Sequence, residues 1–263
     1  MKNIKDRYND LHKQYLDVGG DLFDAADIDQ AAVSYSYNTC GIEGNTITLG
    51  ETESIVMNDQ VIPGKSFQEH LEIKDAHRAF KKMFDFIEGK YEMNEELAMT
   101  FHKLNTKSWM KEEWSGSYKT INNRVGGRST PYPEKAKDLF KQLFRELKEI
   151  DDPFLRAAKL HLDTVVIHPW QDGNGRTARL LMNYELISNG HGHLQLRKVD
   201  KEEYFHAIRT SIKDKKPDPF SDYLYHLGIE TYRKKIAFLT EKKILKEKDQ
   251  DGLWEYSDEV EIY

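Results

Sequence analysis

The sequence predicts a mainly α-helical fold with one short β-hairpin, and three observations lead to this prediction. Apolar residues recur at three- and four-residue spacing through most of the 263 residues, with charged residues between them. The alternating pattern typical of half-buried strands is scarce. Residues 115–133 are the exception, because their glycines and an Asn-Asn pair favour turns over helix.

A helix that carries a glutamate at its end is predicted near the N-terminus. It runs through residues 31–43 and could be capped by Asp27 or Asp29. Gly44 supplies a left-handed stop, which leaves Glu43 at the end of the helix. A negative charge is unfavourable at that end unless a positive group meets it.

Three more helices precede the hairpin. Thr48 and Glu51 have the spacing of a capping box and begin the first of them. Residues 66–88 have a helical apolar pattern, and Asn94 is placed to cap the next helix. Residues 115–133 follow and are predicted to form a hairpin, which we call the flap.

The C-terminal half predicts five helices, of which residues 154–167 should form a central one. Leu155, Ala158 and Leu162 lie on one apolar stripe of that segment. The other four helices are predicted over residues 134–150, 179–188, 200–213 and 219–248. The remaining C-terminal residues are acidic and aromatic without a period, and no structure is predicted for them.

Length and composition favour one domain with appendages. The hydrophobic content of 38% is enough for one sizeable core. We expect an N-terminal region over residues 1–60, a core domain over residues 61–228, and a C-terminal helix with an acidic tail over residues 229–263. The formal net charge of -6 gives no indication of a nucleic-acid partner.

The sequence predicts a cytoplasmic protein. Cys40 is the only cysteine, so no intrachain disulfide can form, which fits a reducing compartment. The first residues lack the apolar run of a signal peptide. No segment approaches the roughly 20 apolar residues that span a bilayer, so no membrane partner is expected.

Residues 168–176, HPWQDGNGR, place a glycine-rich turn between two predicted helices. Pro169 disfavours helical backbone at His168, so the apolar helix should end at or just before the histidine. Gly173 and Gly175 permit backbone angles that let successive N–H groups point into one concavity. Such a nest at a helix N-terminus binds anions, and phosphate is the usual one.

The next helix has two arginines in its first turns, and they indicate which kind of anion would bind. Arg176 and Arg179 oppose the helix dipole, which costs on the order of a few tenths of a kcal/mol each unless an anion pairs with them. Standing three apart, they can bind adjacent phosphates. Asp172 could hold a divalent cation that bridges phosphate oxygens. A nucleotide with Mg²⁺ is therefore the predicted ligand, with His168 beside it as a base.

This segment resembles the signature of Fic-domain proteins, H-x-F-x-[DE]-G-N-G-R-x-x-R. Trp170 replaces the usual phenylalanine and should still pack as an aromatic anchor. Family members often have Gly-x-Tyr-Arg leading into the flap, where this sequence has Lys119. The resemblance spans residues 35–230 approximately and implies a Fic-type helical bundle with the flap beside the active-site loop.

The resemblance implies transfer of AMP from ATP to a Ser, Thr or Tyr hydroxyl of a target protein, with release of pyrophosphate. It also implies a role for each residue of the motif: His168 takes the hydroxyl proton, Asp172 coordinates Mg²⁺, Gly173, Asn174 and Gly175 cradle the phosphates, Arg176 stabilises the leaving group, and Arg179 binds the γ-phosphate. The flap would bind a segment of the target protein by strand-like pairing.

The adenine subsite is less well defined by the sequence. Tyr204 is a possible adenine contact through stacking. An asparagine that is common in related proteins has no clear counterpart near Ser211 and Ile212. The sequence therefore predicts phosphate binding but does not specify the base.

A second match lies far from the motif. Residues 39–44, TCGIEG, resemble the family's inhibitory helix pattern, [ST]-x-x-x-E-[GN]. A carboxylate of Glu43 paired bidentately with Arg179 would occupy the place of the γ-phosphate and leave ATP misaligned. The resemblance therefore implies an autoinhibited enzyme. In some relatives the same glutamate also orients a water that removes AMP, and the sequence leaves both roles open.

Two alternatives to AMP addition remain open. The same site could remove AMP from a target or transfer another phosphate-containing group. The protein could also be a catalytically silent nucleotide sensor that changes its partner affinity or oligomeric state. The target protein and a possible homo-oligomer are not specified by the sequence.

Overall fold

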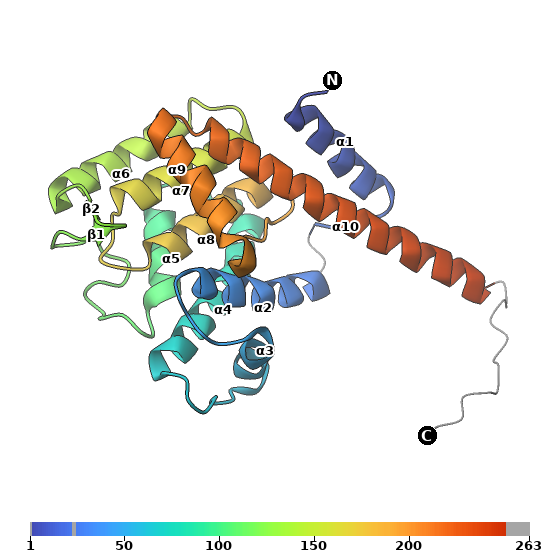
Figure 1. The fold of residues 1–263 in the computed structure, drawn as a ribbon, viewed down its shortest axis with the longest axis horizontal. Coiled ribbons are helices and arrows are strands. Elements are labelled where there is room, and N and C mark those ends of the chain that lie inside the picture. Colours follow the sequence, from blue (N-terminus) through green and yellow to red (C-terminus); the bar gives the residue numbers. More distant parts are fainter. Residues whose placement is uncertain (1, 23–24, 251–263) are drawn as a thin grey trace. The chain divides into compact units, whose positions relative to one another are not determined.

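The computed structural model describes residues 2–22 and 25–250 and confirms a mainly helical fold with one small hairpin (Figure 1). The elements in chain order are α1 (Ile4–Asp17), α2 (Ala25–Ile42), α3 (Leu49–Asn58), α4 (Phe67–Glu88), α5 (Glu95–Thr106), β1 (Arg124–Val125), β2 (Arg128–Ser129), α6 (Pro133–Leu147), α7 (Pro153–Ile167), α8 (Asn174–Ser188), the short 3-10 helix η1 (Lys198–Asp200), α9 (Lys201–Asp214) and α10 (Asp218–Gln250). Among these described helices, none is both long enough and apolar enough to cross a membrane.

The helix starts follow the capping signals in most cases. Thr48 forms the predicted capping box with Glu51, and the Asn94 side chain accepts from the backbone N–H of Leu97. The start of α2 was predicted wrongly. This helix begins at Ala25, so Asp27 lies in its first turn and does not cap it. Its acidic side chain still complements the positive end of the helix dipole there.

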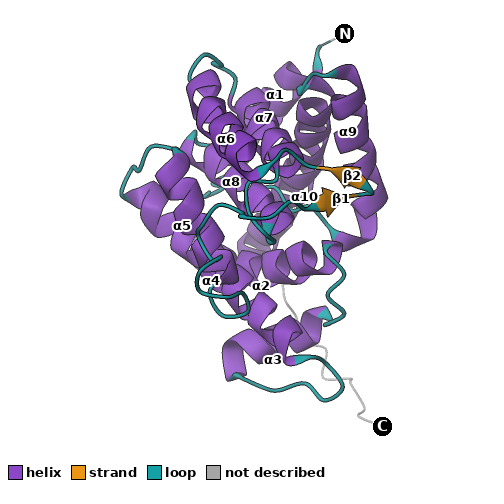
Figure 2. Ribbon diagram, turned by 90° about the vertical axis from the view of Figure 1, so that its left-hand side faces the viewer, coloured by secondary structure: helices purple, strands orange, loops and turns teal. Residues whose placement is uncertain are grey.

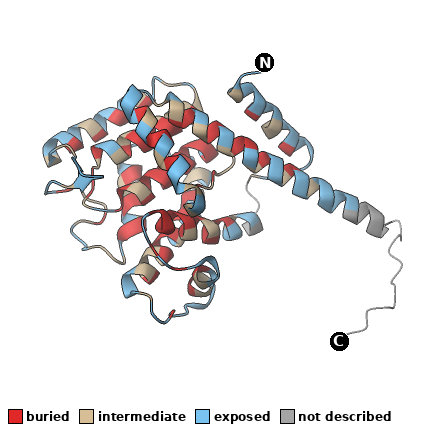
Figure 3. Cartoon of the chain, in the orientation of Figure 1, coloured by how far each residue is buried: buried red, intermediate tan, exposed pale blue. Residues whose placement is uncertain are grey.

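The central pair of helices is α7 and α8, which the loop of residues 168–173 joins. Nearly every residue of α8 is buried, including its charged ones (Figure 3). A helix that is buried all round lies in the core. The aromatic residues of this core include Phe80, Phe101, Phe140 and Trp170. The loop between α7 and α8 is therefore held by well-packed helices on both sides.

The chain forms two compact units. One contains residues 22–224 and thus the helices from α2 to α9, and the other contains residues 2–21 and 225–250 of the described part. In the second unit, Tyr8 of α1 packs edge-on against Tyr225 and also contacts Tyr232. The division at residues 60 and 228 stays a prediction, and the acidic tail over residues 251–263 lies outside the described residues.

The flap contains a two-stranded antiparallel hairpin (Figure 2). Arg124 pairs with Ser129 and Val125 with Arg128. Gly126 and Gly127 form the turn with φ of 54° and 79°. Positive φ at both central positions is typical of a type I′ turn, which only small or special residues adopt easily. The glycine signal in the sequence therefore located the hairpin correctly.

Candidate active site

His168 stands at the exact junction between α7 and the active-site loop. It caps α7 with a left-handed backbone of φ 53°, so the helix ends at Ile167 as Pro169 predicts. Its Nδ1 lies 3.3 Å from the carbonyl oxygen of Val165. A carbonyl can only accept, so Nδ1 carries the proton and Nε2 keeps its lone pair. Burial lowers the pKa of His168, which favours this neutral base form.

The turn after the histidine has the geometry of an anion nest. Gly173 has φ 75° and precedes α8, whose first residue is Asn174. The Asn174 side chain accepts from the backbone N–H of Trp170 at 3.1 Å and donates to the Trp170 carbonyl at 3.0 Å. A Cβ at Gly173 would lie 2.8 Å from Cγ2 of Thr106. Conformation and close packing thus both require glycine there.

His102 of α5 is a supporting residue that the sequence did not reveal. Its Nδ1 accepts from the backbone N–H of Gly116 at 2.9 Å, so Nε2 donates to the carbonyl of Asp172, also at 2.9 Å. The ring stacks on Trp170 with centroids 4.5 Å apart. Burial lowers the pKa of His102 to about 3, which keeps the ring neutral. His102 therefore ties the entry of the flap to the active-site loop.

His102 should make the folded state sensitive to acid. The pKa of His102 is about 3 in the folded chain and 6.5 in the unfolded chain. Below pH 6.5 the unfolded state therefore binds a proton at this residue, and the folded state does not. Stability is then full above pH 6.5 and is lost on acidification, by at most about 1.4 kcal/mol per pH unit for one group. Urea unfolding between about pH 6.5 and 4.5 should show a shallower loss of stability in His102→Gln than in the unaltered chain. An unchanged slope in His102→Gln, or the same flattening in the exposed control His206→Gln, would contradict the prediction.

Arg179 and Glu43 meet although they lie far apart in the sequence. Arg179 Nη2 donates to Glu43 Oε1 at 2.7 Å, and the same guanidinium donates to the side chain and the carbonyl of Thr39 at 2.8 and 2.9 Å. Burial alone would raise the pKa of Glu43, but the charge and the hydrogen bond of Arg179 hold it below its usual value. Glu43 is thus ionised. The contact involves one carboxylate oxygen, Oε1, whereas the sequence predicted a bidentate pair.

Gly175 explains how the Glu43 carboxylate comes so close to α8. A Cβ at this position would overlap Oε1 of Glu43 and would lie 3.2 Å from Nη1 of Arg179. The glycine therefore leaves room for an anionic oxygen directly above the first turn of α8. The carboxylate of Glu43 lies where the nest can receive negative charge.

Arg176 is buried and has a carboxylate partner of its own. Its Nη1 lies 3.2 Å from Glu72 Oε1, and its Nη2 lies 3.8 Å from Asp172 Oδ1. The guanidinium carbon lies 4.4 Å from the centroid of the Trp109 ring. Nε and Nη1 have no hydrogen-bond partner among the described residues. Nη1 still forms its ion pair with Glu72, whereas Nε has neither contact in the described part of the chain and is a donor suited to an anionic ligand. Neither Glu72 nor Trp109 was predicted from the sequence.

Asp172 is exposed, with 67% of its side chain accessible. Its Oδ1 accepts from the backbone N–H of Gly173 at 2.5 Å. No cluster of three or more His, Cys, Asp or Glu side chains suited to a metal occurs in the described part of the chain. A single accessible carboxylate beside an anion-type nest would fit Mg²⁺, which binds through one or two carboxylates together with substrate phosphates.

Tyr204 is a buried neighbour of Arg179. Its hydroxyl is 2.9 Å from Nε2 of His161 and 3.4 Å from Nη1 of Arg179. The residue is only 2% exposed, and its ring packs against His161, Phe205 and Phe220. These contacts support Arg179. Stacking of adenine on Tyr204 stays a prediction and would require the ring to become uncovered.

The base of the flap is fixed to the active-site loop. The backbone N–H of Lys119 donates to the Pro169 carbonyl at 2.9 Å, and the Asn123 side chain donates to the Trp170 carbonyl at 3.1 Å. The Lys119 ammonium is buried and donates to Asn123 at 3.0 Å and to Thr130 at 2.7 Å. Burial lowers the pKa of Lys119 to about 8. The hairpin thus stands beside the loop that carries His168.

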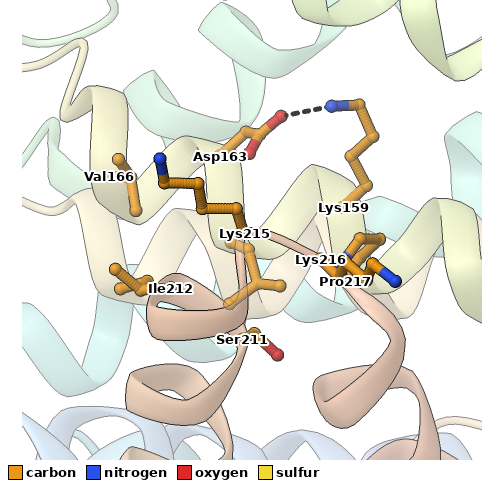
Figure 4. Close-up of a pocket in the computed structure, with 9 residues that line it drawn as sticks. Lys159, Asp163, Val166, Ser211, Ile212, Lys215, Lys216 and Pro217 are labelled. Carbon is orange, nitrogen blue, oxygen red and sulfur yellow. Dashed lines mark hydrogen bonds and ion pairs between the residues drawn. The ribbon is translucent and has the colours of Figure 1, made fainter.

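A separate surface pocket of about 290 Å³ adjoins α7 and α9 (Figure 4). It is lined by Lys159, Leu162, Asp163, Val166, Ser211, Ile212, Lys215, Lys216 and Pro217. Lys159 and Asp163 form an ion pair of 2.8 Å at its edge. None of the predicted site residues lines this pocket.

Together, the buried arginines, the nest and the neutral histidine define a protein whose site is suited to phosphate groups and to a proton transfer beside them. Residues 72–186 match the model of the Fic/DOC family. The chain belongs to this family.

Curated relatives support the same assignment. Protein adenylyltransferase fic-1 of Caenorhabditis elegans is 34% identical over 184 residues, which are 67% of this chain and 36% of the relative. Protein adenylyltransferase Fic of Drosophila ananassae is 32% identical over 186 residues, which are 69% of this chain and 37% of the relative. The chain thus spans little more than a third of the length of these relatives.

Solved structures share the fold. A structure of Fic-1 from C. elegans superposes with a TM-score of 0.78 at 24% identity and covers 91% of this chain and 73% of that one. A Fic domain containing signaling protein from Bacteroides thetaiotaomicron superposes with a TM-score of 0.77 at 22% identity, over 89% of this chain and 97% of that one. The helical bundle with its hairpin is therefore a Fic fold.

Proposed function

We propose that the protein is a protein adenylyltransferase that moves AMP from ATP to a Ser, Thr or Tyr hydroxyl of a target protein. The observation that carries the proposal is the neutral His168 beside a nest at Gly173 and two buried arginines. The activity in the names of the curated relatives supports the reaction. A cytoplasmic location and self-association belong to the proposal as well.

The reaction follows from the placement of these groups. Nε2 of His168 takes the proton of the target hydroxyl as its oxygen attacks the α-phosphorus. The bond from the α-phosphorus to the oxygen bridging to the β-phosphate breaks, and pyrophosphate leaves. Arg176 and the amides at the start of α8 stabilise the charge on the leaving group. Asp172 would hold Mg²⁺, which neutralises charge on the phosphate oxygens when bound.

Glu43 restrains this reaction in our proposal. Its ionised carboxylate lies 2.7 Å from Nη2 of Arg179, the group assigned to the γ-phosphate. A triphosphate that cannot reach Arg179 is held with its α-phosphorus out of line for attack. Oε1 of Glu43 occupies the space directly over Gly175, which phosphate oxygens of ATP would also need. This overlap supports a competition between Glu43 and the triphosphate.

The flap is the proposed docking site for the target protein. The described hairpin strands are exposed along their length, and their edges offer backbone groups for pairing. The polar contacts at the base of the flap hold these edges near His168. A backbone-paired segment of the target would present its hydroxyl to the histidine.

Labelled ATP tests the proposed reaction. The unaltered chain and its Glu43→Gly variant are incubated with a cell lysate and either α-labelled or γ-labelled ATP. The proposal expects a labelled protein band with α-labelled ATP only, and a stronger band with the variant. A band with γ-labelled ATP would indicate phosphate transfer, and no band with either label would disprove the proposed function.

Removal of divalent cations should abolish the reaction. Without Mg²⁺, the negative charge of the triphosphate meets the carboxylate of Asp172 directly, which is unfavourable. Excess EDTA should therefore abolish labelling by the Glu43→Gly variant, and added MgCl₂ should restore it. Undiminished labelling in EDTA would show that the reaction does not need the proposed cation.

A further inference from the structure

Lys198 of η1 holds the end of α2 that carries Glu43. Its backbone N–H donates to Oδ1 of Asn38 at 2.8 Å, and its Nζ donates to the carbonyl of Asn45 at 3.0 Å. These two partners stand on either side of Glu43 in the sequence. A single residue from a distant segment therefore spans the last turns of α2 and the residues that follow it.

The stem of Lys198 fills the space beside a glycine of α2. A Cβ at Gly41 would lie 2.5 Å from Cδ of Lys198 and 3.2 Å from its Cε. Glycine inside a helix is about 1 kcal/mol less favourable than alanine. Its occurrence at this position is explained by the passage of the lysine stem across the helix.

The charge of Lys198 suits its location. The last turn of α2 contains no basic residue, and the end of a helix carries a partial negative charge. The Lys198 ammonium lies beyond that end on the Asn45 carbonyl and 5.7 Å from the centroid of the Tyr37 ring. It is half-buried, so solvent screens it only partly.

The other contacts of the same segment show what Lys198 adds. The side chain of Asn45 donates to the Glu69 carbonyl and to Glu72 of α4. Thr39 binds Arg179 from the preceding turn of α2. Lys198 adds contacts on both sides of Glu43: its backbone N–H binds Asn38 before it, and its ammonium binds Asn45 after it.

We propose that Lys198 is a positioning residue that keeps Glu43 on Arg179 by holding the C-terminal turns of α2. Helix ends open locally at low cost unless tertiary contacts hold them. Loss of the ammonium should increase the fraction of molecules in which Glu43 has left Arg179 and ATP can bind productively. This inference rests on the proposed inhibitory role of Glu43.

The test combines one substitution with two backgrounds. Lys198→Met keeps most of the apolar stem and loses the ammonium. Lys201→Met is the matched control, because Lys201 is an exposed lysine at the start of α9 and its loss changes the net charge equally. Each substitution is made in the unaltered chain and in Glu43→Gly. AMP incorporation from α-labelled ATP is measured, together with amide hydrogen exchange over residues 36–46.

The expected result is specific to the presence of Glu43. Lys198→Met should raise AMP incorporation roughly threefold to tenfold in the unaltered chain, the range expected for losing one hydrogen bond of ordinary strength, because solvent partly screens the half-buried ammonium. In Glu43→Gly it should change nothing, and Lys201→Met should change nothing in either background. Exchange over residues 36–46 should become faster in Lys198→Met. Unchanged incorporation, or an equal rise in both backgrounds, would overturn the proposal.

The exchange measurement separates this proposal from the proposed function. If Glu43→Gly transfers no AMP at all, the proposed function fails. Unchanged exchange in Lys198→Met would then overturn the positioning role, and faster exchange would support it as a restraint on α2.

A second variant covers the case in which Lys198→Met does not fold. Gly41→Ala raises the helix propensity of α2 and also displaces the Lys198 stem. It should raise AMP incorporation only when Glu43 is present. If Gly41→Ala leaves AMP incorporation unchanged, the result counts against the proposal. Lower incorporation also counts against it, because that is the effect of a more stable α2 alone.

Discussion

Replacing His168 with alanine should reduce AMP transfer at least about a hundredfold, because a general base in this position contributes on the order of 10² to 10⁴ in rate. The neutral ring has its proton on Nδ1 and its lone pair on Nε2, and His168 begins the loop that leads to the nest at Gly173. The substitution removes that lone pair without touching the nest. Initial rates with α-labelled ATP, measured in the Glu43→Gly background where the signal is largest, check the prediction.

ATP binding is the control for this substitution. Gly173, Arg176 and Arg179 remain in place in His168→Ala, so ATP affinity measured by calorimetry should change little. His206→Ala, which removes an exposed histidine of α9, should keep the full rate. A His168→Ala variant that transfers AMP at an undiminished rate would show that another group takes the proton.

The local signals of the sequence correctly predicted most backbone features of the candidate site. Pro169 marked the end of α7, the glycines marked the nest, and the same pattern of turn residues marked the flap. These features depend on the backbone preferences of a few neighbouring residues, which a sequence displays directly. The fold class followed from helical periodicity for the same reason.

The supporting contacts were not predictable in this way. His102 and Glu72 belong to helices with ordinary amphipathic patterns, and Trp109 lies in the turn after α5. Their roles arise only because α4 and α5 pack beside α8. No spacing rule connects residues that are brought together by tertiary packing. The Glu43 pairing with Arg179 was foreseen through family resemblance, since nothing in the local sequence relates two residues so far apart.

Replacing Glu43 with glycine should raise AMP incorporation by roughly tenfold to a hundredfold, as expected if the productive state is populated at the level of a few per cent or less in the unaltered chain. Arg179 is 2% exposed and loses its carboxylate partner in the variant. A buried guanidinium without a counter-ion is unfavourable, so the γ-phosphate should now be bound more strongly. Initial rates with α-labelled ATP measure the increase.

The isosteric variant Glu43→Gln separates loss of charge from loss of helix structure. It keeps the length of the side chain, so α2 should remain intact while the attraction to Arg179 falls. Without nucleotide it should melt at a lower temperature than the unaltered chain, and ATP with Mg²⁺ should raise its melting temperature more. If Glu43→Gln and Glu43→Gly both incorporate AMP at the rate of the unaltered chain, Glu43 does not restrain the site.

An increase in incorporated AMP has two possible origins, and the placement of Glu43 requires that they be distinguished. Relief of inhibition raises the initial rate of labelling, because more ATP binds in line with the target hydroxyl. Loss of a hydrolytic glutamate leaves the initial rate unchanged and slows the later decay of label. After labelling, a chase with excess unlabelled ATP measures that decay in the unaltered chain and in Glu43→Gly. The distance of 2.7 Å between Glu43 and Arg179 leads us to expect the first result. Equal initial rates with slower decay in the variant would instead assign Glu43 to AMP removal.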